Sequence, residues 1–491
     1  MLWSTIEDFI HKQPEKIAVI GSDISLTWAS LYQYTLVMSA RLKKENHSVI
    51  AFYADNSPAW IVVDLACQLA NITFLPLPLF FSDKQLQHAV KQAGSTALLH
   101  DNNDRINRLF DLKEADLSLI EPFDLTLYSL NYPSVLLAEN TNKITFTSGS
   151  TGQPKGVCLS ENQQVTVAKS VLARTQLIAP RHLSILPFST LLENISGIYS
   201  PLLGGGTVIA ISQDKLGFNG GAGFDIAKLT TTISHYQPSS MILLPELLLS
   251  LLGAIKQGWK MPSSLRFIAV GGSKVSASLL QSALLANLPV YQGYGLSECA
   301  SVISLNACDN NDLSSVGKPL EHVDIVIEND EIVASGNTFL GYIGEPSSGL
   351  KDKTYTGDLG FFDKQGYLHI TGRKKNVLIS SLGRNINPEW LESELLANGL
   401  LQQCVVFGDA KPYCIALIMP RNKQTSHHEL QQWIDSVNSE FPDYAYIKAW
   451  FILPDLLSFR AGLMTSNGRP IRDKIFHHYQ TQINRLYKDE K

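Results

Sequence analysis

Residues 143–163 read KITFTSGSTGQPKGVCLSENQ, in which a short β-prone run is followed by a loop rich in glycine, serine and threonine. We predict a strand at the start of this stretch and a helix at its end, where Ser160 and Gln163 have the spacing of a capping box. The loop between them supplies hydroxyl groups, glycine backbone that can approach an anion closely, and the positive charge of Lys155. These groups suit phosphate, so the stretch indicates a phosphate-binding loop in an α/β fold.

The loop does not match either of the two common nucleotide-binding motifs. A Walker A loop requires G-x-x-x-x-G-K-[ST], and a Rossmann dinucleotide site requires G-x-G-x-x-G; neither is present. A loop of this composition, taken alone, is more often a plain surface turn. Its interpretation therefore depends on the rest of the chain.

The remaining sequence continues the α/β pattern and then changes. Between residues 48 and 100, β-branched or aromatic runs alternate with helical stretches, which is typical of a layered sheet with helical crossovers. Further on the pattern changes to hairpins, one of which turns at Asn329 and Asp330. Residues 376–491 predict a separate small α+β unit, whose first helix begins after the N-cap residue Asn387.

The composition is that of a globular protein that handles small molecules. The 491 residues have a formal net charge of −5, with 45% hydrophobic and 17% charged residues, which excludes a disordered or fibrous chain. No basic run indicates nucleic acid or an anionic membrane as a partner. The N-terminus lacks a secretion signal and the six cysteines form no C-x-x-C pair, so we predict a cytoplasmic protein with reduced thiols in or near its core.

Residues 241–255 (MILLPELLLSLLGAI) form an unusually apolar segment. The segment is shorter than the roughly 20 residues that span a bilayer, and Pro245 and Glu246 interrupt it. We predict a buried strand that leads into a packed helix, and no transmembrane segment. The alternatives are a wall of an acyl-chain site or a peripheral membrane contact.

Four further segments follow the loop and offer groups that a nucleotide requires. GYGLSE at 293–298 combines an aromatic face, a hydroxyl and a carboxylate, which suit a base, a phosphate and a Mg²⁺ ion. YTGD ends at Asp358, whose carboxylate can accept from two ribose hydroxyls. GRKK at 372–375 and SNGR at 466–469 are turns that present cations. Each segment has an ordinary structural explanation, but the five in this order indicate a nucleotide site.

Together these motifs resemble those of the AMP-forming acyl- and aryl-CoA ligases, a family that includes firefly luciferase and the adenylation domains of peptide synthetases. The matching segments are TFTSGSTGQPKGV, YGLSE, YTGDLG, GRKKN and NGRPIR, and the resemblance covers nearly the whole chain. It implies an α/β fold with a large layered N-terminal domain, residues 1–374, that includes a distorted β-barrel subdomain. It also implies a small α+β C-terminal lid domain, residues 375–491, that moves about a hinge at Lys375.

The resemblance also implies a role for each matching residue. The loop would hold the β- and γ-phosphates of ATP through Thr147, Ser148, Gly149, Ser150, Thr151, Gly152 and Lys155. The adenosine and α-phosphate would lie against Gly271, Gly272, Ser273, Tyr294, Gly295, Ser297 and Asp358. Glu298 would be the Mg²⁺ ligand, and the catalytic residues would be Lys155, Glu298, Arg373 and Arg469.

The implied activity is formation of an acyl-AMP from ATP and a carboxylic acid, then transfer of the acyl group to the thiol of coenzyme A. The leucine-rich segments 186–206 and 241–255 favour a fatty or other hydrophobic acid, as in fatty acid metabolism, and aryl acids remain open. Two alternatives remain: an acyl-AMP ligase that loads an acyl carrier protein, and a nucleotide-binding protein without enzymatic activity.

Two positions depart from the family pattern. Thr190 stands where many acyl-CoA ligases have histidine, and Arg469 stands where the family has a lysine that bridges the carboxylate and the phosphate. Arginine keeps the charge but is a wider, planar group. Three outcomes are therefore open: Arg469 takes the role of that lysine, Lys474 takes it instead, or the protein has lost adenylation. We expect the first.

Overall fold

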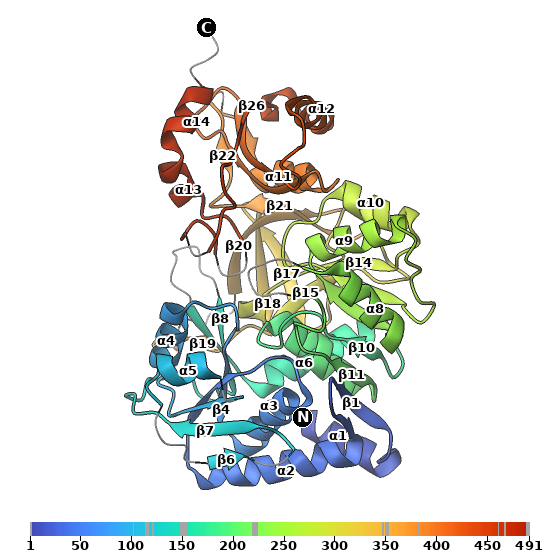
Figure 1. The fold of residues 1–491 in the computed structure, drawn as a ribbon, viewed down its shortest axis with the longest axis vertical. Helices are drawn as coiled ribbons and strands as arrows, with labels where there is room; N and C mark the ends of the chain where they lie inside the picture. Colours follow the sequence, from blue (N-terminus) through green and yellow to red (C-terminus); the bar gives the residue numbers. More distant parts are fainter. Residues whose placement is uncertain are drawn as a thin grey trace.

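The computed structural model describes the following residues of the chain: 2–101, 103–112, 117–119, 122–147, 155–218, 224–345, 348, 353–381, 383–459, 461–465 and 468–487. A large body carries the first three quarters of the chain, and a smaller unit, orange to red, lies at one end of it (Figure 1). Among the described residues, no helix is long and apolar enough to cross a bilayer.

The first sheet of the large body has eight strands. Their spatial order is β19 (Gly341–Tyr342), β9 (Lys155–Leu159), β8 (Lys143–Thr147), β4 (Thr73–Pro76), β3 (Val49–Tyr53), β5 (Ala97–His100), β7 (Leu125–Ser129) and β6 (Leu117–Leu119). The predicted alternation between residues 48 and 100 is confirmed, because α3 (Pro58–Ala70) and α4 (Asp83–Gln92) connect the parallel strands β3, β4 and β5. A short helix, α5 (Asp104–Leu109), follows β5.

The second sheet has nine strands and is parallel in its centre. The order is β16 (Lys318–Pro319), β15 (Ser301–Leu305), β14 (Val290–Leu296), β13 (Phe267–Val270), β12 (Ser240–Leu243), β10 (Arg181–Leu183), β11 (Thr207–Ala210), β1 (Ile17–Gly21) and β2 (Ser25–Thr27). Its helices are α1 (Leu2–Lys12), α2 (Trp28–Lys44), α6 (Glu161–Thr175), the π-helix η1 (Glu193–Tyr199), α7 (Ser200–Leu203), α8 (Ile226–Tyr236), α9 (Pro245–Lys256), α10 (Ala277–Leu285) and the 3₁₀ turn η2 (Ser297–Cys299). Both sheets contribute to one hydrophobic core, which contains Phe52 and Phe74 from the first and Val19 and Val208 from the second.

The apolar segment 241–255 is a strand and a helix, as predicted. Its first residues lie in β12, and α9 begins at Pro245, a favoured residue for the first turn of a helix. Leu247, Leu248 and Leu251 of α9 are buried in the core.

A third sheet joins the large body to the smaller unit. It is antiparallel, in the order β17 (Val323–Glu328), β18 (Glu331–Gly336), β20 (Lys353–Phe362) and β21 (Leu368–Arg373), and it stands where the barrel subdomain is expected. The predicted hairpin is confirmed: β17 and β18 are joined at Asn329 and Asp330, which both have positive φ.

The C-terminal unit has a three-stranded sheet of β24 (Leu401–Phe407), β25 (Cys414–Pro420) and β26 (Ile447–Ile452). The other elements are β22 (Leu378–Ile379), β23 (Asn385–Ile386), α11 (Pro388–Leu396), α12 (His427–Asn438), η4 (Asp443–Ala445), α13 (Arg472–His478) and α14 (Gln480–Leu486). Helix α11 has Asn387 as its N-cap, as predicted. Two hydrophobic clusters, one on each face of the sheet, are built from residues of this unit alone.

Two predictions at this level are wrong. The phosphate-binding loop does not lead from a strand into a helix: β9 follows it and pairs antiparallel with β8, so the loop connects a hairpin. The cause is that the β-prone residues 156–159 form part of strand β9. Helix α6 begins only after this strand, at the capping box that Ser160 and Gln163 form. Of the six cysteines, Cys308 is exposed and the other five are buried.

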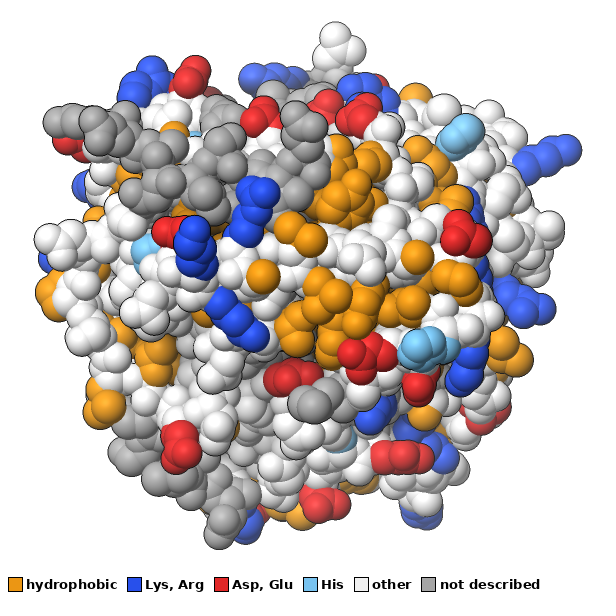
Figure 2. Space-filling model, turned by 90° about the horizontal axis from the view of Figure 1, so that it is seen from below, with side chains coloured by type: hydrophobic (Ala, Val, Ile, Leu, Met, Phe, Trp, Pro, Cys, Tyr) orange, Lys and Arg blue, Asp and Glu red, His pale blue; other side chains and the backbone are white. Residues whose placement is uncertain are grey.

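Charged side chains of both signs lie on the face of the molecule that is seen from below (Figure 2). On the face seen from below in Figure 2, lysine and arginine side chains are interspersed with acidic ones and with hydrophobic groups. Among the described side chains of that face (Figure 2), neither sign of charge forms a large patch of the kind that binds nucleic acid.

Candidate active site

The candidate site lies where β14 leaves the parallel part of the second sheet. Up to Gln292 this strand pairs with β13, and from Gly293 it pairs antiparallel with β15. Gly295 is required there, because a Cβ atom at this position would lie 1.9 Å from the carbonyl oxygen of Ser301. The segment from Tyr294 to Glu298 is thereby held at the edge of the sheet, next to the third sheet and the C-terminal unit (Figure 1).

Asp358 is held by a tyrosine and an arginine. The Tyr294 hydroxyl donates to Oδ2 of Asp358 at 2.7 Å, and Nε of Arg373 donates to Oδ1 at 2.7 Å. Asp358 and Arg373 are directly opposite each other on β20 and β21, which explains their contact. Asp358 is only 5% exposed, a burial that its sequence motif does not indicate.

The electrostatics of this cluster favour a protonated Tyr294 and a charged Arg373. Burial and the Asp358 carboxylate both raise the pKa of the Tyr294 phenol, which therefore remains a donor. Burial opposes the charge of Arg373, but the attraction of Asp358 outweighs it and raises the pKa of the guanidinium. The carboxylate is thus fixed in orientation, and the remaining lone pairs of its oxygens are suited to accepting from hydroxyl groups.

Glu298 and Lys155 both contact a tyrosine that the sequence analysis did not single out. The Tyr342 hydroxyl donates to Oε1 of Glu298 at 2.9 Å, and Nζ of Lys155 lies 5.0 Å from the centre of the Tyr342 ring. No local pattern marks Tyr342, because its position depends on the pairing of β19 with β9. Among the described residues, Tyr342 is the only side chain that hydrogen-bonds the Glu298 carboxylate.

The C-terminal unit reaches the same region through Arg469. Its Nη2 donates to the carbonyl oxygen of Gly272 at 2.7 Å, and Gly272 belongs to the exposed turn after β13 that includes Ser273. Desolvation by the surrounding protein and the positive charge of Arg373 lower the pKa of Arg469. Lys474, the alternative, is exposed on α13, and among the described residues it makes no hydrogen bond or ion pair.

Several predicted site residues have no described contact. The residues Ser148, Gly149, Ser150, Thr151 and Gly152 and the side chain of Thr147 lie outside the described residues. The two ends of their loop are defined, since Thr147 pairs with Lys155 in the β8–β9 hairpin. Ser297 is half-buried at the start of η2, between Tyr294 and Glu298 in sequence.

A cavity of about 50 Å³ lies between strands β12, β13 and β15 of the second sheet and the helices α6, η1 and α7. Both leucine-rich segments border it: Leu192, Ser196 and Ser200 from the first, Met241 and Ile242 from the second. The rest of its lining is mainly aliphatic and aromatic, and includes Ala269, which precedes the Gly271–Gly272 turn by two residues. The buried Ser196 hydroxyl has no hydrogen-bond partner within the described part of the chain.

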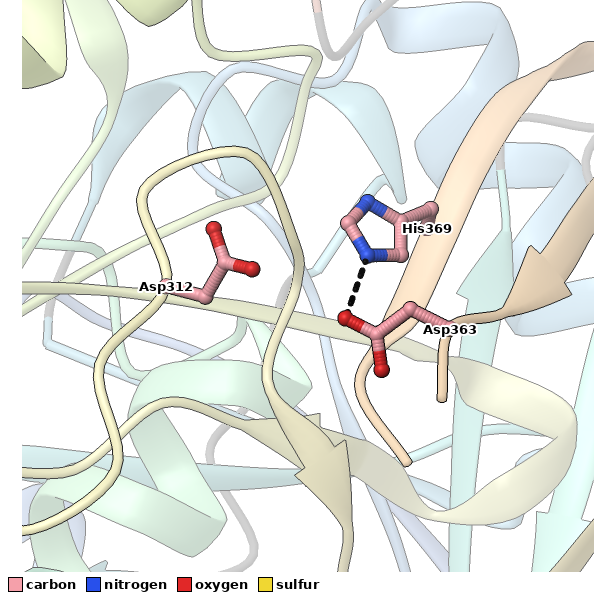
Figure 3. A group of neighbouring side chains, drawn as sticks. All are labelled: Asp312, Asp363 and His369. Carbon is pink, nitrogen blue, oxygen red and sulfur yellow. Dashed lines mark hydrogen bonds and ion pairs between the residues drawn. The ribbon is translucent and has the colours of Figure 1, made fainter. Parts of the chain in front are cut away.

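One group of side chains within the described residues has the composition of a metal site but lies elsewhere. Asp312, Asp363 and His369 approach one another at the turn between β20 and β21 (Figure 3), and Nε2 of His369 lies 3.2 Å from Oδ2 of Asp363. Asp363 is five residues from Asp358, about 16 Å along the strand. Backbone N–H groups of Gln365 and Tyr367 donate to the other oxygen of Asp363, so this carboxylate is used in the hairpin turn.

Comparison with known proteins places these observations in a family. Residues 6–344 match the family model described as AMP-binding enzyme, and residues 375–491 match the AMP-binding enzyme C-terminal domain. The 2-succinylbenzoate–CoA ligase of Bacillus subtilis is 26% identical over 80% of this chain and 82% of its own. A long-chain fatty-acid–CoA ligase of Mycobacterium bovis is 28% identical over 64% of this chain and 59% of its own.

A solved structure shows the same fold. The o-succinylbenzoate CoA synthetase of Bacillus subtilis, in complex with ATP and magnesium ion, superimposes with a TM-score of 0.76 at 22% identity, over 96% of this chain and 98% of that protein. The fold is therefore that of the adenylate-forming enzymes. With its two family domains in order, this chain belongs to the AMP-binding enzyme family of adenylate-forming acyl- and aryl-CoA ligases.

Proposed function

We propose that this protein uses ATP, Mg²⁺ and coenzyme A to convert a compact hydrophobic carboxylic acid, of the aryl class, into its CoA thioester. The acid carboxylate attacks the α-phosphorus of ATP and pyrophosphate leaves; the CoA thiol then loses its proton, attacks the acyl carbonyl carbon, and AMP leaves. The observation that carries the proposal is the contact of Arg469 with Gly272, which brings a cation of the C-terminal unit to the region of Tyr294, Asp358 and Arg373.

The adenosine end of the site is supported by the Asp358 cluster. Its carboxylate, held by Tyr294 and Arg373, is suited to accept from the two ribose hydroxyls. The aromatic ring of Tyr294 and the Gly272 turn supply the surfaces for the base.

The residues present fit a magnesium ion at Glu298. Only Oε1 of this carboxylate is engaged by Tyr342, and a carboxylate oxygen is a preferred Mg²⁺ ligand. When bound, the ion would neutralise charge that develops on the phosphate oxygens. Lys155, at the end of the phosphate loop, would add a second positive charge above the Tyr342 ring.

Arg469 replaces the family lysine in this proposal. Its guanidinium has five N–H donors, enough to keep the Gly272 carbonyl and still bridge a carboxylate and a phosphate. A cation in this position offsets the repulsion between the two anions and so favours attack. Among the described residues Lys474 makes no contact with the site, whereas Arg469 reaches Gly272, which argues against the alternative.

The contacts on either side of Lys375 support a hinge there, with the domain boundary between 374 and 375. Lys374 is bound to the third sheet, because Nζ lies 2.9 Å from Oε2 of Glu331 and its backbone N–H donates to Gly357. Asn376 is bound to the C-terminal unit through Nδ2, which donates to Oε1 of Glu389 on α11 at 2.6 Å. Rotation at Lys375 would also break the hydrogen bonds that the Asn376 and Val377 N–H groups donate to the Arg373 carbonyl oxygen.

The cavity supports a compact acid rather than a long chain. At about 50 Å³ it has room for roughly three or four water molecules, far less than a long acyl chain occupies. Its apolar lining suits an aromatic or short aliphatic group, and the similarity to a 2-succinylbenzoate–CoA ligase is consistent with an aryl acid. A fatty acid is the second candidate, favoured by the similarity to the mycobacterial ligase.

A pyrophosphate-release screen tests the proposal. The panel contains benzoate derivatives and straight-chain acids of four to sixteen carbons, each with and without CoA. We expect release with aryl acids, a steep fall with chain length, and thioester formation only with CoA. Thioester on a phosphopantetheinylated carrier protein, with none on CoA, would instead favour a carrier-loading ligase; no release with any acid would favour a nucleotide-binding protein without activity.

A further inference from the structure

Residues 339–342 hold Glu298 at both its backbone and its side chain. The Phe339 N–H donates to the Glu298 carbonyl oxygen at 2.6 Å, and the Tyr342 hydroxyl donates to its carboxylate at 2.9 Å. The two aromatic rings pack edge to face, with centroids 4.8 Å apart. Both contacts come from one segment, so Glu298 cannot shift without moving it.

The same tyrosine is fixed relative to Lys155. Strand β19 pairs antiparallel with β9, with Tyr342 opposite Val157, and the Ile343 N–H donates to the Gly156 carbonyl oxygen at 3.0 Å. Gly156 permits this approach, because a Cβ atom there would lie 2.2 Å from Cδ1 of Ile343. The Tyr342 ring is thereby held below the Lys155 ammonium, at the 5.0 Å of a cation–π contact.

We infer that Tyr342 is a positioning residue that sets the Glu298 carboxylate and the Lys155 ammonium at a fixed separation, so that both face the same phosphate groups. This inference rests on the proposed function, which assigns Glu298 to Mg²⁺ and Lys155 to phosphate. Oxygen Oε1 is held by Tyr342, so Oε2 is the oxygen presented to the ion.

The chemistry of the phenol suits this role. The Tyr342 hydroxyl donates to the Glu298 carboxylate at 2.9 Å while the Lys155 ammonium lies over the ring of the same side chain. Its ring face is at the same time the negative end of the quadrupole that attracts an ammonium. One side chain thus contacts an anion through its hydroxyl and a cation through its ring.

Two substitutions separate the two contacts. Tyr342→Phe removes the hydroxyl and keeps the ring, whereas Tyr342→Leu removes both. Tyr413→Phe is the matched control, since its hydroxyl donates to the Leu486 carbonyl oxygen at 2.9 Å within the C-terminal unit, away from Glu298. Thermal unfolding of each variant verifies that it folds.

Calorimetric titration of each variant with ATP, at a series of Mg²⁺ concentrations and in EDTA, is the test. Mg²⁺ should increase the affinity for ATP. We expect Tyr342→Phe to raise, by about five- to tenfold, the Mg²⁺ concentration at which half of this increase is reached, and to leave the affinity measured in EDTA unchanged. Tyr342→Leu should also weaken binding in EDTA by about threefold, and Tyr413→Phe should match the unmodified protein.

The outcomes distinguish this inference from the proposed function. It is overturned if Tyr342→Phe has the Mg²⁺ dependence of the unmodified protein, if it weakens binding equally with and without Mg²⁺, or if the unmodified protein does not bind Mg²⁺ and ATP together. A protein that binds both with the expected variant pattern but releases pyrophosphate with no acid would support the role of Tyr342 and overturn the proposed activity.

Discussion

Two clusters in this protein have the same chemical composition and opposite surroundings. The first is fully buried: the Tyr199 hydroxyl donates to Oδ2 of Asp64 at 2.7 Å, and Nζ of Lys143 lies 2.9 Å from Oδ1. These residues come from η1, α3 and β8, and all are at most 1% exposed. Every group is directed at another protein group, so the cluster ties helices to a sheet and offers nothing to a ligand.

The second cluster repeats the arrangement at the candidate site. Tyr294 and Arg373 each hold Asp358 at 2.7 Å, but the side chain of Arg373 is 40% exposed. A tyrosine, a carboxylate and a cation therefore do not by themselves indicate function. Access to solvent on one side separates a cluster that stabilises the fold from one that can bind.

The largest expected effect is on the buried cluster. Lys143→Met should lower the free energy of unfolding by about 3–5 kcal/mol, because the Asp64 carboxylate would remain buried without its cation. Urea unfolding followed by tryptophan fluorescence measures this. Lys143→Met combined with Asp64→Asn, which removes both charges, should recover part of the loss; a single variant as stable as the unmodified protein would refute this account.

Arg469→Ala should have the largest effect on activity and almost none on stability. We expect carboxylate-dependent pyrophosphate release to fall by about 10²–10³-fold, because a cation at the developing charge is lost, while thioester formation from supplied acyl adenylate largely survives. Arg469→Lys should retain adenylation. Lys474→Ala is the control; a loss with Lys474→Ala but not with Arg469→Ala would reverse the assignment.

The sequence predicted the elements better than it predicted their surroundings. Local patterns were sufficient for the capping box at Ser160 and the turn at Asn329, because these depend on neighbouring residues. Burial of Asp358 depends on β14 and β21, which are distant in sequence, and so it was missed. The hairpin that carries the phosphate loop was missed because strand β9 is only five residues long and precedes an obvious helix.

The candidate site shows the same limit. The motifs predicted that Glu298, Asp358 and Arg469 belong to one site, but they carried no information on Tyr342, which contacts Glu298 through the pairing of two short strands. The buried cluster of Asp64 and Lys143 was also unmarked, since a lone charged residue in an apolar run has no partner that can be identified from one sequence.

Matched substitutions at the two tyrosines sharpen the comparison directly. Tyr294→Phe should raise the KM for ATP by about tenfold, the equivalent of about 1.4 kcal/mol, because Asp358 loses one of its two fixed partners. Tyr199→Phe should leave this KM unchanged and lower the stability instead. Steady-state kinetics gives the KM for ATP of each variant, and urea unfolding gives its free energy of unfolding. Equal changes in KM would show that burial does not distinguish a structural cluster from a binding one.

The smallest expected effect concerns the contact between the C-terminal unit and the large body. Oε1 of Glu394 on α11 accepts from the Ala277 N–H at 2.9 Å, and Oε2 accepts from the Ser278 hydroxyl at 2.7 Å. Ala277 is the first residue of α10, so the carboxylate also benefits from the positive end of that helix. The contact is exposed to solvent, which limits its contribution to roughly 0.5–1 kcal/mol.

This contact exists only while α11 lies against α10, the arrangement in which Arg469 reaches Gly272. If the C-terminal unit must rotate about Lys375 for thioester formation, the contact favours the adenylation step and opposes the second step. Glu394→Ala should therefore raise the rate of thioester formation from acyl adenylate by about two- to fivefold, which corresponds to 0.5–1 kcal/mol, and slightly lower pyrophosphate release. Ser278→Ala, which removes one of the two hydrogen bonds, should shift the same ratio of rates by less. Single-turnover measurements of both steps give the ratio of the rate of thioester formation to the rate of pyrophosphate release. If Glu394→Ala leaves this ratio unchanged or lowers it, Glu394 does not restrain the rotation.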